Sequence, residues 1–244
     1  MDLDSATLTV RNVGELVATL QALHGKASGP LWFRGHRCAQ WQLRPTVHRA
    51  QGLREADLAS QFVLEAPARH SAIPALDDLS AWLTLMRHYG LPSRLLDWTD
   101  SPLVAAYFAV AYEQGEGDRA IWALRPVELN ELHGVQGIPF LTHDAVRSLV
   151  EHAFGRGHGG GMTLAVRAAQ MDLRMALQAA RYTIHGSTDA LDESADASSF
   201  LSQLVIPGEA VDQFKADLSL LGIRRSVLFP DLEHLAKELQ EGQP

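Results

Sequence analysis

The chain has 244 residues, of which 46% are hydrophobic and 20% charged, and it carries a formal net charge of −8. This composition is typical of a soluble globular protein that can bury a sizeable core. The acidic balance argues against a broad surface for nucleic acid or anionic membrane, which would need an excess of Lys and Arg. Cys38 is the only cysteine, so an intrachain disulfide is excluded and nothing indicates an oxidising compartment.

The first residues, MDLDSATLTVRN, lack the basic start and the apolar segment of a signal peptide. No apolar run approaches the length needed to cross a bilayer. We therefore expect a cytoplasmic protein without a membrane partner, and export by a leaderless secretion system stays open.

In the first part of the chain, hydrophobic periodicity and turn residues predict an alternation of short strands and helices. We expect strands at 7–10, 31–34 and 42–47, with the last two paired, and helices at 13–24, 55–65 and 76–88. A strand at 95–98 then leads into a helix at 103–112, for which Ser101 is the capping residue and Pro102 occupies the first position.

In the second part, the same signals predict strands at 120–125, 164–166 and 204–207 and helices at 144–154, 209–221 and 231–239. Residues 174–183 are ambiguous between helix and strand, and 186–199 form an acidic loop. Strands and helices mix without strict alternation, and no repeat or bare linker divides the chain. The pattern favours one α+β domain.

Two polar clusters follow apolar segments, LWFRGH at 31–36 and HYGLPSRLLDWTDS at 88–101. Arg34 ends a predicted strand and Gly35 follows, so the guanidinium could hold a phosphate while the missing side chain lets a ligand approach the backbone. An equally good interpretation is a buried ion pair of Arg34 or Arg94 with Asp97 that joins two strands.

The segment 97–101 places carboxylates, hydroxyls and an indole directly ahead of a helix. A helix N-terminus offers backbone N–H groups to an anion or to a ribose-bearing ligand. Helix capping by Thr99, Asp100 or Ser101 is the alternative, but capping accounts for one of these residues rather than for all five.

Other motifs are weak. The chain has no HExxH or His-x-His pair and no second cysteine, so we predict no metal site and interpret His36 and His88 as hydrogen-bonding residues. No Gly-x-Ser-x-Gly nucleophile elbow occurs, and Cys38 is interpreted as a packing residue. The glycine-rich segment 155–161 lacks the Lys-Ser/Thr of a phosphate-binding loop and is predicted to be a mobile surface loop.

The motifs LWFRGH, WQLRPTVHR and WLTLMRHYGLPSRLLDWTDSPLVAAYFA closely resemble those of the FRG domain, a bacterial and phage-associated family named for a Phe-Arg-Gly motif. Here that motif is Phe33-Arg34-Gly35. The family usually has Gln where this chain has Arg87, and Thr where it has Ser93. RMALQAARYTIHG at 174–186 resembles a further family segment. The resemblance implies a single FRG domain over 1–244, with a core at about 10–240.

The layout of this family resembles that of ADP-ribosyltransferases, which implies a split β-sheet flanked by helices, with NAD as substrate. Under that resemblance Arg34, Thr99, Ser101 and Gln178 would be the catalytic residues. NAD would be bound by Arg34, Gly35, His36, Tyr89, Arg94, Asp97, Trp98 and Tyr107. The other partner would be an unknown macromolecular acceptor, nucleic acid being unlikely, and the biological role that of a toxin or phage-defence effector.

The late glutamate of ADP-ribosyltransferases has no clear counterpart. Gln178 is the polar residue of the matching segment, and Glu193 and Glu209 are unaligned alternatives. A non-catalytic nucleotide-binding or protein-interaction module therefore remains the alternative function, with the motif residues forming a structural network. A nucleic-acid enzyme or binder is the second rival, against which the acidic pI speaks.

Overall fold

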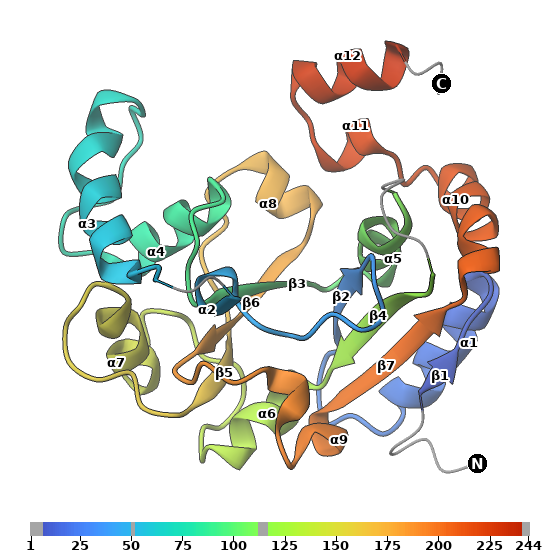
Figure 1. Cartoon of the computed structure of the whole chain (residues 1–244), viewed down its shortest axis with the longest axis horizontal. Coiled ribbons are helices and arrows are strands. Elements are labelled where there is room, and N and C mark those ends of the chain that lie inside the picture. The colour runs from blue at the N-terminus through green and yellow to red at the C-terminus, as the bar shows by residue number, and fades with distance from the viewer. Residues whose placement is uncertain (1–6, 50–51, 112–116, 241–244) are drawn as a thin grey trace.

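The computed structural model describes residues 7–49, 52–111 and 117–240. Its centre is a seven-stranded mixed sheet of order β1-β7-β4-β2-β3-β6-β5, with helices against both faces (Figure 1). The predicted α+β class is confirmed. In the described residues, no helix combines the length and the apolar character that a membrane span requires.

The strands are short and mostly antiparallel. Their bounds are β1 (Leu8–Thr9), β2 (Trp32–His36), β3 (Leu95–Thr99), β4 (Arg119–Leu124), β5 (Thr163–Val166), β6 (Ala180–His185) and β7 (Leu201–Ile206). Only β1 and β7 pair in parallel among these strands.

The helices are α1 (Val13–His24), α2 (Thr46–Arg49), α3 (Glu55–Glu65), α4 (Leu79–His88), α5 (Pro102–Val110), α6 (Pro126–Leu132), α7 (Asp144–Ala153), α8 (Leu173–Leu177), α9 (Ala197–Phe200), α10 (Val211–Leu220), α11 (Arg225–Leu228) and α12 (Leu232–Gln240). Short 3-10 turns lie at Ala66–Ala68, Leu191–Glu193 and Gly208–Ala210. The bounds predicted for α1 and α3 are confirmed, and the end of the predicted 103–112 helix lies outside the described residues.

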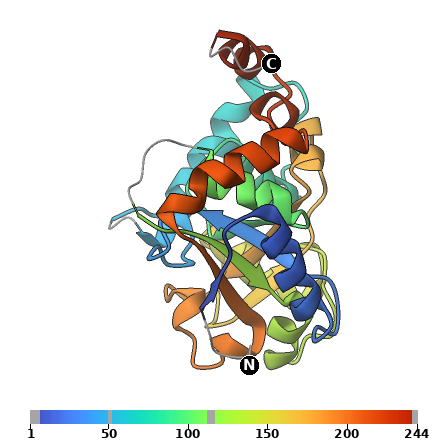
Figure 2. The same cartoon turned by 90° about the vertical axis from the view of Figure 1, so that its right-hand side faces the viewer.

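Alternating residues of β4 direct the core to two faces of the sheet, as strand geometry requires. Ile121 and Ala123 pack with α1, α5 and α10, while Trp122 and Leu124 pack on the other face with α6 and α9. Figure 2 shows α1 and α10 lying across the same face of the sheet.

One predicted element is corrected, and one ambiguous segment is resolved. Residues 42–47 do not form a strand: the N–H of Leu43 bonds to Asp192 Oδ1, 2.7 Å away, and the residues after Pro45 begin α2. The ambiguous segment 174–183 contains both structures, because α8 ends and β6 begins around Ala179. That residue has a φ of 47°, which lets the chain reverse from helix to strand.

All seven strands are hydrogen-bonded into one sheet, but the β2–β3 junction is narrow. Its only register pair is Phe33–Thr99, whereas β3 pairs with β6 along five residues and β2 with β4 along five. Beyond that pair, β2 and β3 diverge. This divergence creates the space in which the candidate site lies.

Gly35 serves a different purpose from the one predicted. A Cβ on this residue would overlap the carbonyl oxygen of Ala105 and lie 2.7 Å from the backbone nitrogen of Ala109. The missing side chain therefore lets the backbone of α5 approach β2, and α5 occupies the side on which a Cβ would stand. Glycine here fixes the helix that follows the Asp97–Ser101 segment.

Replacing Gly35 with Ala will destabilise the fold by about 1–3 kcal/mol, because α5 has to move away from β2. Urea unfolding monitored by circular dichroism will measure the loss. Gly161→Ala is the matched control, since a Cβ there meets no heavy atom within 4 Å. Equal unfolding free energies of the two variants would contradict the packing role of Gly35.

Candidate functional site

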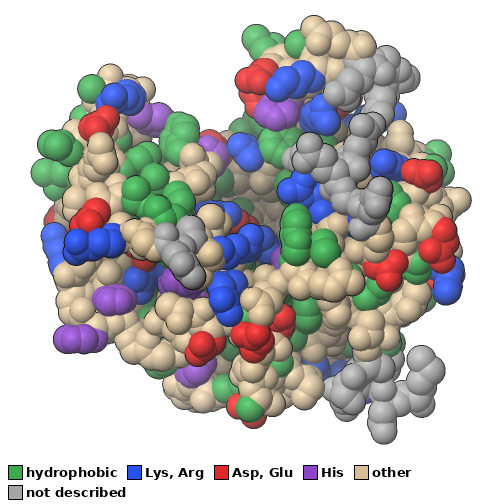
Figure 3. Space-filling model, viewed as in Figure 1, with side chains coloured by type: hydrophobic (Ala, Val, Ile, Leu, Met, Phe, Trp, Pro, Cys, Tyr) green, Lys and Arg blue, Asp and Glu red, His purple; other side chains and the backbone are tan. Residues whose placement is uncertain are grey.

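A cavity of about 590 Å³ opens where β2 and β3 diverge, and we call it the junction pocket. Its walls are contributed by β2, β3, β6, the end of α4 and the region of α8. Figure 3 shows the hollow between the α3–α4 region and the α11–α12 region, with Lys and Arg side chains gathered in it. The volume lies within the range usual for small-molecule and cofactor sites.

The lining of the junction pocket is strongly basic, although the chain as a whole has a net charge of −8. Five arginines line it against a single carboxylate, Asp97; they are Arg34, Arg37, Arg49, Arg87 and Arg174. Guanidinium groups bind phosphate and carboxylate oxygens in pairs, so this concentration of arginine favours an anionic ligand.

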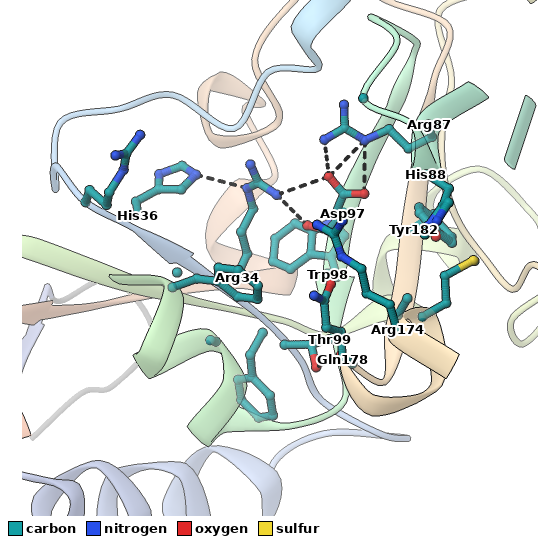
Figure 4. Close-up of a pocket in the computed structure, with 18 of the residues that line it drawn as sticks. Arg34, His36, Arg87, His88, Asp97, Trp98, Thr99, Arg174, Gln178 and Tyr182 are labelled. Carbon is teal, nitrogen blue, oxygen red and sulfur yellow. Dashed lines mark hydrogen bonds and ion pairs between the residues drawn. The ribbon is translucent and has the colours of Figure 1, made fainter. Parts of the chain in front are cut away.

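Asp97 lies between two of these arginines (Figure 4). Arg87 Nε donates to both carboxylate oxygens, at 3.0 and 2.9 Å, and its Nη2 forms a further bond to Oδ2. Arg34 Nη1 donates to the Asp97 main-chain oxygen at 2.7 Å and lies 3.9 Å from Oδ2. Arg34 thus fills the space that the diverging strands leave, and it satisfies a carbonyl that has no strand partner there.

Burial and charge together set the protonation of these groups. Desolvation opposes ionisation of Asp97, but the charges of Arg87 and Arg34 and the bonds from Arg87 outweigh it and hold the pKa of Asp97 below its ordinary value. Burial, helped by the charge of Arg87, lowers the pKa of Arg34 to about 10. Both side chains are therefore charged at neutral pH.

His36 is uncharged and accepts a hydrogen bond from Arg34. Burial, followed by the charge of Arg34, lowers the pKa of His36 to about 3. Its Nε2 accepts from Arg34 Nε at 3.0 Å, and its Nδ1 lies 3.1 Å from the carbonyl oxygen of Trp41, to which it donates. Both ring nitrogens are occupied, which fixes the direction of the guanidinium.

The opposite wall is formed where β3 and β6 meet. Thr99 Oγ1 donates to the main-chain oxygen of Gln178 at 2.7 Å and accepts from Ser101 N at 3.1 Å. The Gln178 side chain donates through Nε2 to Leu228 O, 3.1 Å away, which ties this wall to α11. The neighbouring Ala179 is, within the described part of the chain, the one non-glycine residue with positive φ.

The structure brings most of the predicted site residues to this one pocket. Arg34, Gly35, His36, Asp97, Trp98, Thr99 and Gln178 all line it. The Trp98 indole itself points into the core, where Nε1 donates to Thr183 Oγ1 at 3.0 Å.

Four predicted residues lie elsewhere. Arg94 is buried against Glu55, with Nε 2.8 Å and Nη2 2.7 Å from Oε2. Ser101 caps α5 through a 3.3 Å bond from Val104 N. Tyr107 is a residue of α5 and packs in the core, and Tyr89 is exposed at the end of α4 outside the pocket lining. The cleft predicted to include Arg94 and Ser101 is corrected accordingly.

Neither glutamate considered as the late acidic residue reaches the pocket. Glu193 pairs with Arg44 and bonds to Gln42, and Glu209 lies in the 3-10 turn after β7. Within the described residues no glutamate lines the junction pocket, so Gln178 is the polar residue that occupies the wall next to Thr99.

The site residues predicted from the motifs did not include Arg87, Arg49, Arg174 and Tyr182, which also line the pocket. Alternation along a strand was the available signal for distinguishing Arg94 from Arg87. Arg94 lies three residues before Asp97, which puts it on the other face and about 10 Å along the strand. Arg87 instead reaches Asp97 from the last turn of α4. No local sequence pattern specifies that this end of the helix packs beside β3.

Residues 29–118 match the model of the FRG domain family. No curated protein and no solved structure matches the chain. The match contains the Phe33-Arg34-Gly35 motif, both strands that flank the junction pocket, and Asp97. The match to the FRG domain thus covers residues 29–118, and this segment includes β2 and β3, which build one half of the pocket.

Within the described residues, no group of three or more His, Cys, Asp or Glu side chains is arranged to hold a metal ion. The polar groups of the junction pocket are mainly cationic, and cations do not ligate metals. The chemistry available there is anion binding, hydrogen bonding and electrostatic stabilisation.

The buried Glu55–Arg94 pair predicts a structural role for Arg94. Glu55→Ala will destabilise the protein by about 3–5 kcal/mol, because it leaves the Arg94 charge buried without its partner. Asp57→Ala removes an exposed pair with Arg54 on the same helix and will cost at most about 1 kcal/mol. Denaturant unfolding will measure the free energy of unfolding of both variants. Equal losses of stability would contradict the structural role of the Glu55–Arg94 pair.

Buried neutral histidines make the fold sensitive to acid. Burial lowers the pKa of His36 and His185 to about 3 and that of His48 to about 4, from an ordinary value of 6.5. The unfolded chain therefore takes up protons first, so this contribution to stability is complete above pH 6.5 and falls as the pH drops from there toward about 3.

Each of these histidines contributes a slope of up to about 1.4 kcal/mol per pH unit. Urea unfolding at a series of pH values will show that His48→Gln has a shallower decline than the wild type. His24→Gln, on the exposed last turn of α1, will leave the slope unchanged. A wild-type stability that stays constant between pH 6.5 and 4.5 would contradict the prediction.

Proposed function

We propose that this FRG-domain chain binds NAD in the junction pocket and transfers its ADP-ribose to an acceptor. The observation that carries the proposal is the joint placement of Arg34, Thr99 and Gln178 on three neighbouring strands or their ends, β2, β3 and β6, around one basic cavity. Residues about 65 and 80 positions apart thereby line one hollow, as the resemblance to ADP-ribosyltransferases implies.

Recognition of the diphosphate is assigned to the arginines. The Nη2 of Arg34 has no hydrogen-bond partner among the described residues, and neither Arg49 nor Arg174 has a carboxylate partner there. These cations would supply paired donors to phosphate oxygens. Their net attraction also explains how an acidic chain would bind an anionic dinucleotide.

The aromatic residues of the lining suit the two bases of NAD. Trp41 is 45% exposed at the edge of the pocket and carries Arg37 over its ring, while Phe108 and Tyr182 lie deeper. Flat apolar surfaces of this kind stack on heterocycles. Thr99 and Gln178 offer hydrogen bonds to the amide or to the ribose beside them.

Bond cleavage would depend on positioning and on charge. The ribose centre becomes positively charged as nicotinamide leaves, and five arginines disfavour that charge. Asp97 is the one anionic side chain of the lining and would stabilise it. Gln178 is neutral, so its amide would orient the ribose hydroxyls without supplying the charge that a glutamate would.

A second candidate is a non-catalytic nucleotide-binding or protein-interaction module. The observation that favours it is the Arg34–Asp97–Arg87 arrangement, in which several polar groups of the motif already satisfy one another. In that function Arg34 mainly holds β2 and β3 together. The Arg34→Ala experiment described next separates the two candidate functions.

Arg34→Ala tests the proposal. We expect the wild type to release nicotinamide from NAD and to label proteins of a bacterial lysate with ADP-ribose. The variant will bind NAD at least about tenfold more weakly, because a charge-assisted hydrogen-bond donor is lost. Chromatography of nicotinamide, label transfer from radioactive NAD and calorimetry of NAD binding are the measurements.

Arg54→Ala is the matched control, because the Arg54 side chain is 77% exposed and does not line the pocket. It will bind and cleave NAD as the wild type does. Thermal unfolding of both variants distinguishes a lost ligand contact from a lost fold. A wild type that binds NAD without cleaving it would favour the second candidate, and one that does not bind NAD would overturn the proposal.

A role as toxin or defence effector is part of the same proposal. Growth arrest on expression of the wild type in bacteria, with normal growth on expression of Arg34→Ala at the same protein level, would support it. Equal growth of the two strains would contradict it.

A further inference from the structure

Transfer of ADP-ribose to a hydroxyl or to water requires a group that accepts the proton of the nucleophile. The pocket has no glutamate among its described lining residues, so another side chain must do this. Its titratable lining residues, apart from the five arginines, are His36, His88, Asp97 and Tyr182. Three of these four can be eliminated on geometry and charge.

His36 has both ring nitrogens in hydrogen bonds, to Arg34 and to Trp41, and cannot accept a further proton without losing one. Asp97 accepts hydrogen bonds from Arg87 on both carboxylate oxygens, and those interactions stabilise its ionised form. Burial, with the charge of Asp97 adding to it, raises the pKa of Tyr182, which keeps the phenol protonated. His88 remains.

His88 lies at the C-terminal end of α4, where the helix ends in the turn Tyr89–Gly90. Its Nε2 lies 2.6 Å from Asp172 Oδ2, and its side chain is 13% exposed, so the ring is held in place at the pocket wall. The other oxygen of Asp172 accepts from Met175 N at 2.8 Å and caps α8. The carboxylate is therefore itself fixed by the fold.

This arrangement sets the tautomer of the imidazole. A carboxylate on Nε2 keeps the proton on that nitrogen, which leaves the lone pair on Nδ1. Nδ1 has no hydrogen-bond partner among the described residues. An imidazole oriented by a carboxylate, with its second nitrogen available, is the usual pair of base and orienting group in nucleophile activation.

The surroundings of His88 contain charges of both signs. Asp172 precedes α8 and Arg174 lies on α8. Tyr89 follows the end of α4 with its ring centroid 5.0 Å from that of His88, and His70 packs edge-on against Tyr89. Arg87 and Asp97, paired with each other, and Tyr182 of β6 complete the titratable groups of the adjoining wall. Asp172 is the one whose carboxylate lies within hydrogen-bonding distance of the ring.

We propose that His88, oriented by Asp172, is the proton acceptor of the transfer reaction in the junction pocket. The inference rests on the proposed function and assigns a catalytic residue that the resemblance did not include. Asp172 is a positioning residue that acts through His88.

In this step the bond between the ribose C1′ and the nicotinamide nitrogen breaks, and its electron pair leaves with nicotinamide, which becomes neutral. The oxygen of the acceptor hydroxyl, or of water, forms a new bond to C1′. The proton of that oxygen passes to Nδ1 of His88, which becomes imidazolium beside the Asp172 carboxylate. No oxidant, reductant or further reactant is needed.

Asp172→Asn is the decisive variant. Asparagine is as good a helix cap as aspartate, so the bond from Met175 N and the α8 helix are retained. Its amide nitrogen can then face Nε2 of His88 as a donor, which moves the ring proton to Nδ1 and removes the lone pair needed there. We expect kcat for nicotinamide release to fall at least about tenfold, with NAD affinity within about twofold of the wild type.

The pH profile supplies a readout that a merely structural pair would not change. The wild-type rate will decline toward acid pH as the imidazole becomes protonated, and this acid limb will be absent from the residual rate of His88→Gln. His24→Gln, on the exposed end of α1, is the control and will keep both the rate and the profile. Thermal unfolding will confirm that each variant is folded.

The outcomes separate the two proposals. A wild type that neither binds nor cleaves NAD overturns the proposed function and, with it, the role of His88. A wild type that cleaves NAD, with Asp172→Asn and His88→Gln retaining the rate and the acid limb, overturns the role of His88 and leaves the proposed function standing. Loss of NAD binding in folded Asp172→Asn would also overturn the role of His88 as proton acceptor, because the His88–Asp172 pair would then serve NAD binding.

Discussion

The divergence of β2 and β3 beyond a single register pair is the constraint on which the candidate site depends. Because Phe33 and Thr99 are paired, Asp97 and Thr99 share a face with Phe33, and Arg34 belongs to the opposite face. In a fully paired sheet their side chains would be separated by the backbone layer. They meet here because the strands separate, and Arg34 bonds to the carbonyl that the separation exposes.

The same divergence is supported from outside the sheet. Gly35 allows α5 to pack closely on β2, and this leaves the N-terminal end of α5 next to Thr99. Ser101 and Pro102 begin the helix, so the cap that sequence alone could specify also fixes the strand end that lines the pocket. Packing and site geometry are therefore not independent: the residues that hold α5 in place also determine where the pocket wall stands.

Sequence patterns predicted the elements built from local signals and failed where tertiary contacts decided. The 3.6-residue periodicity of α1 and α3 was sufficient for their bounds, whereas Leu43 followed a distant partner, Asp192, rather than β2. The motif residues on β2 and β3 were located correctly because they adjoin those strands in the chain. Arg87, Arg49 and Arg174 come from three different helices or their ends, and only the folded chain brings them together.

The alternatives left open for Arg34 turned out not to exclude each other. It does join two strands through Asp97, as the structural interpretation requires, and it still lines a cavity of ligand size. The Arg–Asp pair that sequence could not assign involves Arg87 most closely, while Arg94 binds Glu55 on another helix. Residue type alone does not distinguish these arginines, because each is adjacent to the same motif.

The C-terminal helices are attached to the pocket by side chains that also line it. Gln178 bonds to Leu228 O, and the Arg174 guanidinium lies 4.6 Å from the centre of the Phe229 ring, against which His234 stacks. A ligand that draws either side chain toward itself must break its contact with α11 or the turn that follows. Occupancy of the cavity and attachment of α11 and α12 are then coupled equilibria, so filling the site would change how tightly these two helices are held.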